Sequence, residues 1–212
     1  MSVNKIDQGV FRILIPFENI TTTVYVYEYE QEVAIVDSAN SSLDVDKYIL
    51  PTLHELNIPF ERVKLLLLTH DHGDHCGGLK RLAEVFTEAA IGTSFDISLP
   101  GRVELSDGRF VLGSLMAVLL PGHTSSSFGF YDVNTKTLLS GDCLQLDGIG
   151  KYRSGISDVE KYINSVNKLK SMDIKRIVAA HEYEPFGSIA EGKSAVEQYL
   201  NECIKIAERR KL

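Results

Sequence analysis

One pattern occurs twice in this chain: an apolar strand ends in aspartate, a helix follows, and the next strand ends in histidine. These residues are Asp37 and His70 in the first half, and Asp142 and His181 in the second half. Ligands of open α/β sheets collect beyond the carboxyl ends of the strands. The pattern therefore predicts an α/β fold with two related strand–helix–strand halves that carry these four residues at ligand-binding edges.

Hydrophobic periodicity gives the remaining elements. Strands are predicted where branched and aromatic residues alternate or run together, at residues 10–15, 22–28, 32–37, 63–69, 110–112, 115–120, 127–131, 137–140 and 176–180. Helices are predicted over residues 42–57, after Gly78, from Ser157 onwards, and along the apolar face between Val196 and Ala207. Ser157 and Glu160 have the spacing of a capping box.

Length and composition are those of an ordinary globular protein. The chain has 212 residues, of which 44% are hydrophobic and 24% charged, and we expect a single domain spanning residues 1–212. Apolar runs fall short of the roughly 18–20 residues that span a bilayer, and the N-terminus lacks the pattern of a signal peptide. We therefore expect a cytoplasmic protein with no membrane partner. The net charge of −7 argues against nucleic acid as a partner.

A dense group of potential metal ligands follows the apolar run that ends at Leu68. Within six residues lie His70, His72, Asp74 and His75. A two-residue step in extended chain places side chains on the same side, so His70 and His72 can reach one ion together. Asp74 and His75 fall on the next bend and can face a second ion.

Three isolated residues offer the further ligands that such ions need. His123, Asp142 and His181 each follow an apolar strand and lie near a strand-to-loop junction. Neutral imidazole and carboxylate groups suit zinc, iron or manganese. The sequence therefore predicts a metal site with ligands drawn from several strand ends.

The ordered set of a Thr-His-x-His-x-Asp-His stretch, a Gly-His, a Gly-Asp and a strand-terminal His resembles the metallo-β-lactamase superfamily. The resemblance implies an αββα sandwich of two mixed β-sheets flanked by helices. It also implies two divalent metal ions, most simply zinc, with iron or manganese as alternatives. The implied ligands are His70, His72 and His123 for the first ion, Asp74, His75 and His181 for the second, and Asp142 bridging both. Asp37 matches a position that supports the ligands without binding metal.

The resemblance also implies a reaction. Two ions about 3.5–4 Å apart lower the pKa of a shared water towards about 7, which gives a metal-bridging hydroxide that attacks an electrophilic carbonyl. Asp74 and Asp142 are the candidate catalytic residues that receive and pass the proton. Asp142 and His75 differ from the usual residues of true β-lactamases and resemble those of glyoxalase II-like thioesterases and lactonases. The expected activity is hydrolysis of a small ester, thioester or lactone.

Substrate contacts and the reaction class leave alternatives open. Lys151 and Arg153 are candidate contacts to an anionic small-molecule substrate, or are solvated surface charges; Tyr183 lines the mouth of the site or is simply packed. A different reaction class is a mononuclear iron enzyme resembling persulfide dioxygenases, with a ligand set that corresponds to His70, His123 and Asp142. A binding module on a degenerate enzyme fold is the third possibility. The sequence predicts no oligomeric state.

Overall fold

The computed structural model describes residues 2–146, 155–182 and 187–210. The chain forms two compact units, Met1–Leu105 and Ser106–Leu212, and each unit contains one mixed β-sheet with accompanying helices. The predicted α/β class with two mixed sheets and flanking helices is confirmed. The expectation of a single domain over residues 1–212 stays a prediction.

Unit 1 contains a seven-stranded sheet whose spatial order follows the sequence. Its strands are β1 (Ser2–Asp7), β2 (Val10–Phe17), β3 (Ile20–Tyr29), β4 (Glu32–Val36), β5 (Val63–Leu67), β6 (Ala90–Thr93) and β7 (Arg102–Glu104). Strands β1 to β4 pair antiparallel through tight turns. From β4 to β7 the pairing is parallel, because the connections between β4 and β5 and between β5 and β6 run through helices.

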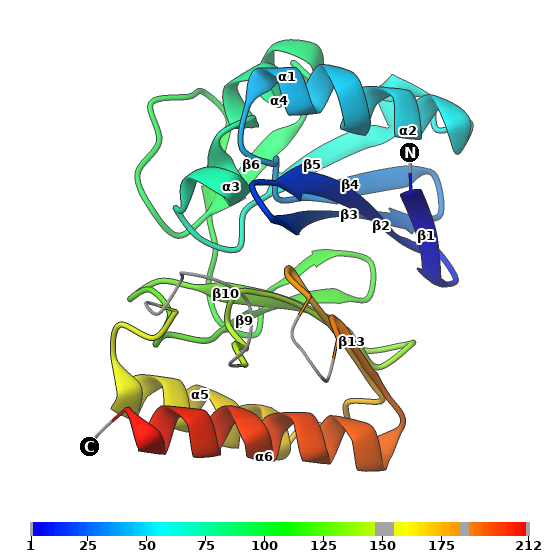
Figure 1. The fold of residues 1–212 in the computed structure, drawn as a ribbon. Helices are drawn as coiled ribbons and strands as arrows, with labels where there is room; N and C mark the ends of the chain where they lie inside the picture. The colour runs from blue at the N-terminus through cyan, green and yellow to red at the C-terminus, as the bar shows by residue number, and fades with distance from the viewer. Residues whose placement is uncertain (1, 147–154, 183–186, 211–212) are drawn as a thin grey trace. The chain divides into compact units, whose positions relative to one another are not determined.

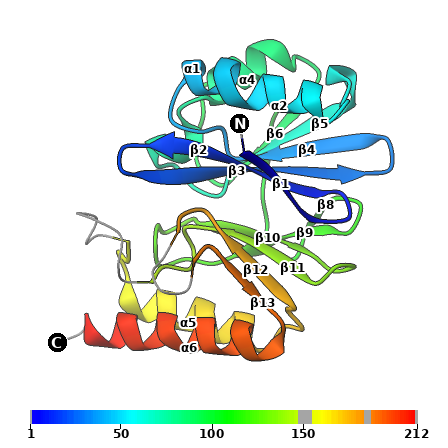
Figure 2. The same cartoon turned by 45° about the vertical axis from the view of Figure 1, so that its right-hand side comes forward.

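The helical segments of unit 1 are α1 (Ser42–Asp44), the π-helix η1 (Val45–Ile49), α2 (Leu50–Glu55), the 3₁₀ turn η2 (Phe60–Arg62), α3 (Gly73–Cys76) and α4 (Leu79–Val85). Helices α1, α2 and α4 cover one face of this sheet (Figures 1 and 2), and α3 lies beside the strand ends (Figure 1). The helix predicted over residues 42–57 is thus interrupted by the π-helical segment η1, which is wider than an α-helix. Pro51 explains the position, since it lacks the N–H that an α-helix would direct to the carbonyl of Lys47.

Unit 2 contains a six-stranded sheet in the order β13-β12-β11-β10-β9-β8. Its strands are β8 (Phe110–Leu112), β9 (Leu115–Leu119), β10 (Phe128–Asp132), β11 (Thr137–Gly141), β12 (Arg176–Ala179) and β13 (Ile189–Glu191). The helices α5 (Val159–Lys170) and α6 (Lys193–Arg209) lie side by side on one face of the sheet (Figures 1 and 2). Strands β11 and β12 are parallel, as the predicted crossover between Asp142 and His181 requires.

The start of α5 differs from the predicted capping box by one residue. Asp158 is the N-cap, and its side chain accepts from the backbone N–H of Lys161. Ser157 does not cap the helix because its N–H and its hydroxyl both donate to the carbonyl of Gly122, at 2.7 and 3.0 Å. The hydroxyl that the pattern assigned to the helix therefore anchors the loop before His123 instead.

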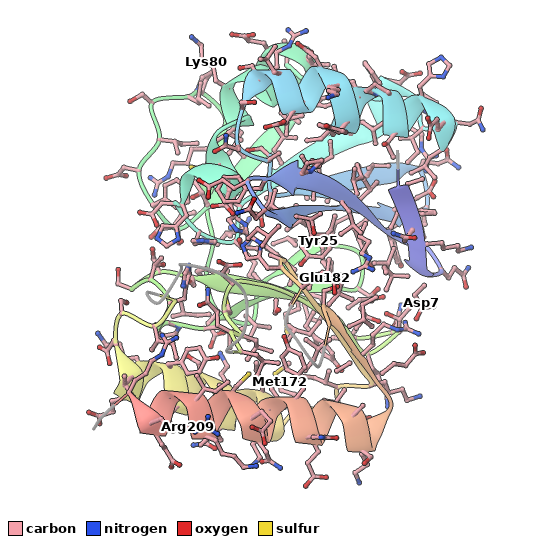
Figure 3. All side chains as sticks on the ribbon, in the orientation of Figure 1. Asp7, Tyr25, Lys80, Met172, Glu182 and Arg209 are labelled. Carbon is pink, nitrogen blue, oxygen red and sulfur yellow. The ribbon has the colours of Figure 1, made fainter. Side chains whose placement is uncertain are left out.

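Each unit has its own hydrophobic core. In unit 2 the core side chains of α5 and α6 include Tyr162, Val166, Tyr199 and Cys203, and Cys203 is buried as its place on the apolar stripe predicts. The three cysteines are not paired in disulfides. Arg209, at the outer end of α6 (Figure 3), lies in the last turn of its helix, where a cation complements the helix dipole.

Among the described residues, the helices are all too short or too polar to cross a membrane. The cytoplasmic location stays a prediction.

Candidate metal centre

The ligand-rich stretch of unit 1 follows β5 and runs into the short helix α3. His72 has extended backbone angles, φ −72° and ψ 147°, and directly precedes α3. The rings of His70 and His72 lie side by side with centroids 4.6 Å apart, as the two-residue step predicts. Asp74 and His75 occupy the only turn of α3, and the His75 ring lies 4.2 Å from that of His70.

Asp37 is the hydrogen-bonding centre of this stretch. It follows β4 in the left-handed region, with φ 65°, and its N–H donates to the carbonyl of Leu67 at 2.8 Å. The fully buried carboxylate accepts from the N–H of Thr69 at 2.8 Å, from its hydroxyl at 2.9 Å, and from His75 Nδ1 at 2.8 Å. The predicted supporting position of Asp37 therefore corresponds to direct contact with one candidate ligand.

These bonds set the tautomers of two histidines. Asp37 accepts from Nδ1 of His75, so the lone pair of a neutral His75 ring is on Nε2. The Thr69 hydroxyl donates to Asp37 and therefore accepts from His70 Nδ1, which lies 3.0 Å away. His70 is thus fixed in the same tautomer through one intervening hydroxyl. Both rings present Nε2 as the metal-binding atom.

Cys76 lies beside this stretch, and its thiol contacts the carbonyl of Asp71 at 3.4 Å. Burial raises the pKa of the Cys76 thiol, and the carboxylates of Asp37 and Asp71 raise it further. A thiol in such surroundings stays protonated at neutral pH and is a poor nucleophile. Cys76 is therefore better suited to packing than to catalysis.

His123 of unit 2 follows β9 and is positioned through Gly122. The carbonyl of Gly122 accepts from the start of α5, and Gly122 has φ 137°, so close to Tyr162 that a Cβ would lie 2.4 Å from the Cα of that residue. Only glycine fits this approach. The Nδ1 of His123 lies 2.6 Å from the carbonyl oxygen of Gly155, which can only accept. Nδ1 therefore carries the hydrogen, and Nε2 is again the ligand atom.

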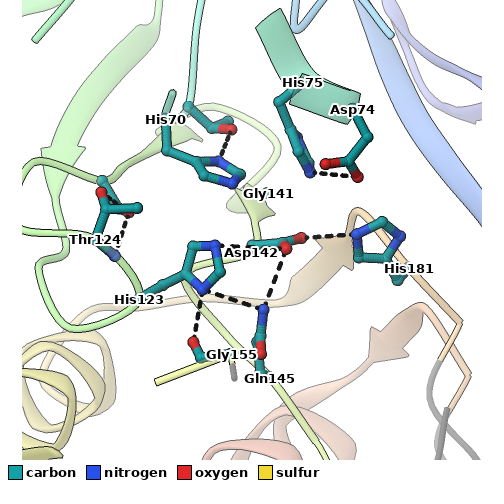
Figure 4. Close-up of polar contacts among 12 residues, drawn as sticks. His70, Asp74, His75, His123, Thr124, Gly141, Asp142, Gln145, Gly155 and His181 are labelled. Atoms are coloured by element: carbon teal, nitrogen blue, oxygen red, sulfur yellow. Dashed lines mark hydrogen bonds and ion pairs between the residues drawn. The ribbon is translucent and has the colours of Figure 1, made fainter. Parts of the chain in front are cut away.

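Asp142 and His181 follow the paired strands β11 and β12 (Figure 4). Asp142 Oδ1 lies 3.2 Å from Nε2 of His181, and Oδ2 lies 3.6 Å from Nε2 of His123. All three residues are at least nine-tenths buried. The carboxylate thus lies between the two histidines and directs one oxygen to each, the arrangement expected of a bridging ligand.

The donor chemistry of both units fits a divalent cation. In unit 1 the Nε2 of His75 faces the carboxylate of Asp74 at 3.2 Å, and in unit 2 the Nε2 of His123 faces that of Asp142. Each of these histidines already donates its Nδ1 hydrogen to another acceptor. A lone pair that faces a carboxylate requires a cation between them, either a proton or a metal ion. Imidazole and carboxylate ligands of this kind suit zinc, iron or manganese.

The structure thus brings together the predicted ligands within each unit: His70, His72, Asp74 and His75 in unit 1, and His123, Asp142 and His181 in unit 2. Their roles toward a metal stay predictions. The candidate substrate contacts Lys151, Arg153 and Tyr183 lie outside the described residues. Sequence reasoning missed Thr69, Gln145 and Gly155 as supporting residues. For Thr69 the signal was a hydroxyl directly before the motif, whereas Gln145 and Gly155 gave none.

A family profile described as the Metallo-beta-lactamase superfamily matches residues 19–98 and 90–181. These matches cover most of the chain and contain every predicted ligand. The chain belongs to the metallo-β-lactamase superfamily. The resemblance inferred from the motifs is therefore confirmed.

Three similar proteins illustrate this relationship. A hydroxyacylglutathione hydrolase of Francisella philomiragia is 30% identical over 161 residues, which cover 71% of this chain and 64% of that protein. A metallo-beta-lactamase family protein of Thermus thermophilus has a TM-score of 0.76 at 21% identity, over 97% of this chain and 81% of that structure. The metallo-beta-lactamase FIM-1 from Pseudomonas aeruginosa, in a mono-zinc form, gives a TM-score of 0.79 at 16% identity, over 100% of this chain and 96% of that structure.

The solved structures and the curated relatives support different conclusions. The solved structures are under 25% identical and show the fold, which is that of the metallo-β-lactamases. The matched region spans less than two thirds of the length of the first curated relatives, 62% and 64%.

Proposed function

We propose that the protein is a dinuclear metallohydrolase that cleaves a small ester, thioester or lactone. The observation that carries this proposal is the paired geometry of His75 and His123. Each ring donates Nδ1 to a fixed acceptor and directs Nε2 at a carboxylate. Such second partners fix ring orientation and raise ligand basicity in metal sites.

In this proposal the two donor sets of the superfamily motif act together. His70, His72 and His123 would hold the first ion, Asp74, His75 and His181 would hold the second, and Asp142 would serve both. Two such ions would supply an activated water at neutral pH and a Lewis acid for the substrate carbonyl. Zinc is the first choice of metal, supported by the mono-zinc form of the FIM-1 relative, and iron or manganese suits the same ligands.

The residues of the chain then have defined tasks. When the water attacks, Asp74 or Asp142 would receive the one released proton and pass it to the leaving group. Asp37 keeps His75 in the tautomer that presents Nε2 by a direct hydrogen bond. It keeps His70 in the same tautomer through the Thr69 hydroxyl. A separate nucleophile is unnecessary, in agreement with the raised pKa of the Cys76 thiol.

The substrate class is supported by the relatives named hydroxyacylglutathione hydrolase, which are 30–34% identical over the matched regions. We propose a thioester or related ester with an anionic group, for which Lys151, Arg153 and Tyr183 are candidate contacts. The net charge of −7 disfavours nucleic acid as a partner, and we propose a small molecule, not a membrane, as the partner of the site. We propose the cytoplasm as the location.

The first test is elemental analysis of protein purified without added metal, with a screen of thioesters, esters and lactones. We expect about two zinc, manganese or iron ions per chain and a marked loss of both metal and hydrolysis in Asp142→Asn. One iron per chain with thiol-dependent oxygen uptake would replace the proposal by the dioxygenase alternative. Metal content and activity unchanged in Asp142→Asn would instead favour a binding module.

A further inference from the structure

The side chain of Gln145 lies against the carboxylate of Asp142 (Figure 4). Its Nε2 is 3.1 Å from Asp142 Oδ2 and 3.3 Å from His123 Nδ1. Because His123 Nδ1 already carries a hydrogen that it donates to Gly155, the contact with Nδ1 joins two donors and adds no attraction. The amide of Gln145 therefore donates to Asp142. His123 is held instead by its hydrogen bond to the carbonyl of Gly155.

The backbone of Gln145 is fixed by the core of unit 2. Its N–H donates to the hydroxyl of Tyr162 at 2.8 Å, and that hydroxyl donates to the Gln145 carbonyl at 3.1 Å. Tyr162 is fully buried in α5, and burial raises the pKa of its hydroxyl well above the usual value. The hydroxyl therefore stays protonated and keeps both bonds. A residue anchored in this way on both sides of its Cα has little freedom to shift.

Gly155 provides the space that the Gln145 amide occupies. A Cβ at position 155 would lie 1.0 Å from Gln145 Oε1 and 2.1 Å from Cδ. These atoms are the end of a flexible side chain, so the fold can accommodate a methyl group by moving the amide. The movement would take the amide away from Asp142. The glycine is thus required for the position of Gln145 more than for the fold.

We propose that Gln145 is a positioning residue for Asp142, and that Gly155 makes its position possible. A carboxylate rotates freely about its last torsion, and the Gln145 amide fixes that rotation. Oδ2 is then kept toward His123 and Oδ1 toward His181. The inference rests on the proposed metal centre, in which each oxygen serves one ion. In this proposal the orientation of the Asp142 carboxylate depends on Gln145, a residue that binds neither metal nor substrate.

The first experiment replaces the donor but keeps the size of the side chain. Gln145→Met is compared with wild type and with Gln198→Met, which changes an exposed glutamine of α6. Zinc affinity is measured by competition with a chromogenic chelator, and the cobalt-substituted proteins are compared by absorption spectroscopy. We expect zinc affinity of Gln145→Met to fall by about 10–100-fold, with an altered cobalt spectrum. Gln198→Met should match wild type.

The second experiment tests the role of Gly155 by a double-mutant cycle. Gly155→Ala should weaken zinc binding in the wild-type background, because the methyl group displaces the amide. In a Gln145→Ala background the same change should have little further effect. Equal effects in both backgrounds would show that Gly155 acts independently of Gln145 and would overturn that part of the proposal.

Asp142→Asn, measured in the same chelator assay, separates this inference from the proposed function. If wild type binds zinc no better than Asp142→Asn, the proposed metal centre is wrong. If wild type binds zinc, Asp142→Asn does not, and Gln145→Met equals wild type in affinity and spectrum, then only the role of Gln145 is wrong. Circular dichroism of all variants confirms that they are folded before these comparisons are made.

Discussion

At the scale of single residues, Asp37 controls the site through hydrogen bonds to Thr69 and His75. It reaches His75 directly and His70 through the Thr69 hydroxyl. A buried carboxylate with three donors loses much of its stabilisation when one donor is removed. The tautomers of two proposed ligands therefore depend on one side chain that binds no metal.

Thr69 gives a direct test of this arrangement. Thr69→Val keeps the shape but removes the acceptor of His70 Nδ1, so His70 is free to adopt the other tautomer. We expect zinc affinity to fall by about 10–100-fold, and the imidazole ¹⁵N shifts of His70 in the metal-free protein to report mixed tautomers. Thr69→Ser retains the hydroxyl and should stay close to wild type. Equal affinities for the valine and serine variants would contradict the role of the hydroxyl.

The sequence predicted the residues whose types are themselves unusual. His70, His72, Asp74 and His75 stand out because metal-binding side chains are concentrated in one short stretch. Gln145 and Gly155 could not be found in this way, because their roles depend on a contact between two separate loops. That contact is set by tertiary structure, and neither residue type is rare in a loop.

At the scale of elements, the apolar segments were predicted well, the three-residue strand β8 among them, whereas four strands were missed. Strands such as β5 and β9 and the helices α5 and α6 carry enough apolar residues to give a clear period. β1, β6, β7 and β13 were not predicted, and three of these have only three or four residues. Such strands depend on the partner at the sheet edge more than on their own pattern.

The packing of α6 against α5 predicts a specific dependence on pH. Burial raises the pKa of the Cys203 thiol to about 12 from an ordinary value of 9.0. The unfolded chain therefore loses this proton first, and the contribution to stability, complete below pH 9, is lost as pH rises from 9 towards 12. The free energy of unfolding should fall by up to about 1.4 kcal/mol per pH unit through this one group.

Urea unfolding of wild type and Cys203→Ser between pH 8 and pH 10 measures this slope. The serine variant lacks a titrating thiol, so its curve should be shallower above pH 9 and parallel to wild type below it. Tyr162, whose pKa is also raised by burial, adds a similar term in both proteins above pH 10. Identical slopes for the two proteins between pH 9 and pH 10 would show that the thiol does not contribute.

At the scale of the whole molecule, the superfamily match extends across both compact units. The proposed ligands are divided between those units, with four residues before Leu105 and three after it. Ions held by both sets would bind the folded chain and not the unfolded one, so binding would add to the free energy of unfolding.

Calorimetry with and without a chelator tests this linkage. With free zinc at about 100 times the dissociation constant, binding adds about 2.7 kcal/mol, which corresponds to a rise in melting temperature of about 5–10 °C for a chain of this size. Asp142→Asn should show a much smaller rise. A chelator that leaves the wild-type melting temperature unchanged would argue against metal bound to the folded protein.

Two backbone hydrogen bonds continue the parallel strand pairs beyond their last residues. The N–H of Asp37 donates to Leu67 in unit 1, and the N–H of Ala180 donates to Gly141 in unit 2. They tie the strand ends together directly beside Asp37 in one unit, and beside Asp142 and His181 in the other. Any opening that admits a substrate must therefore begin farther along the loops, so exchange of these two amides with deuterium should stay slow during turnover.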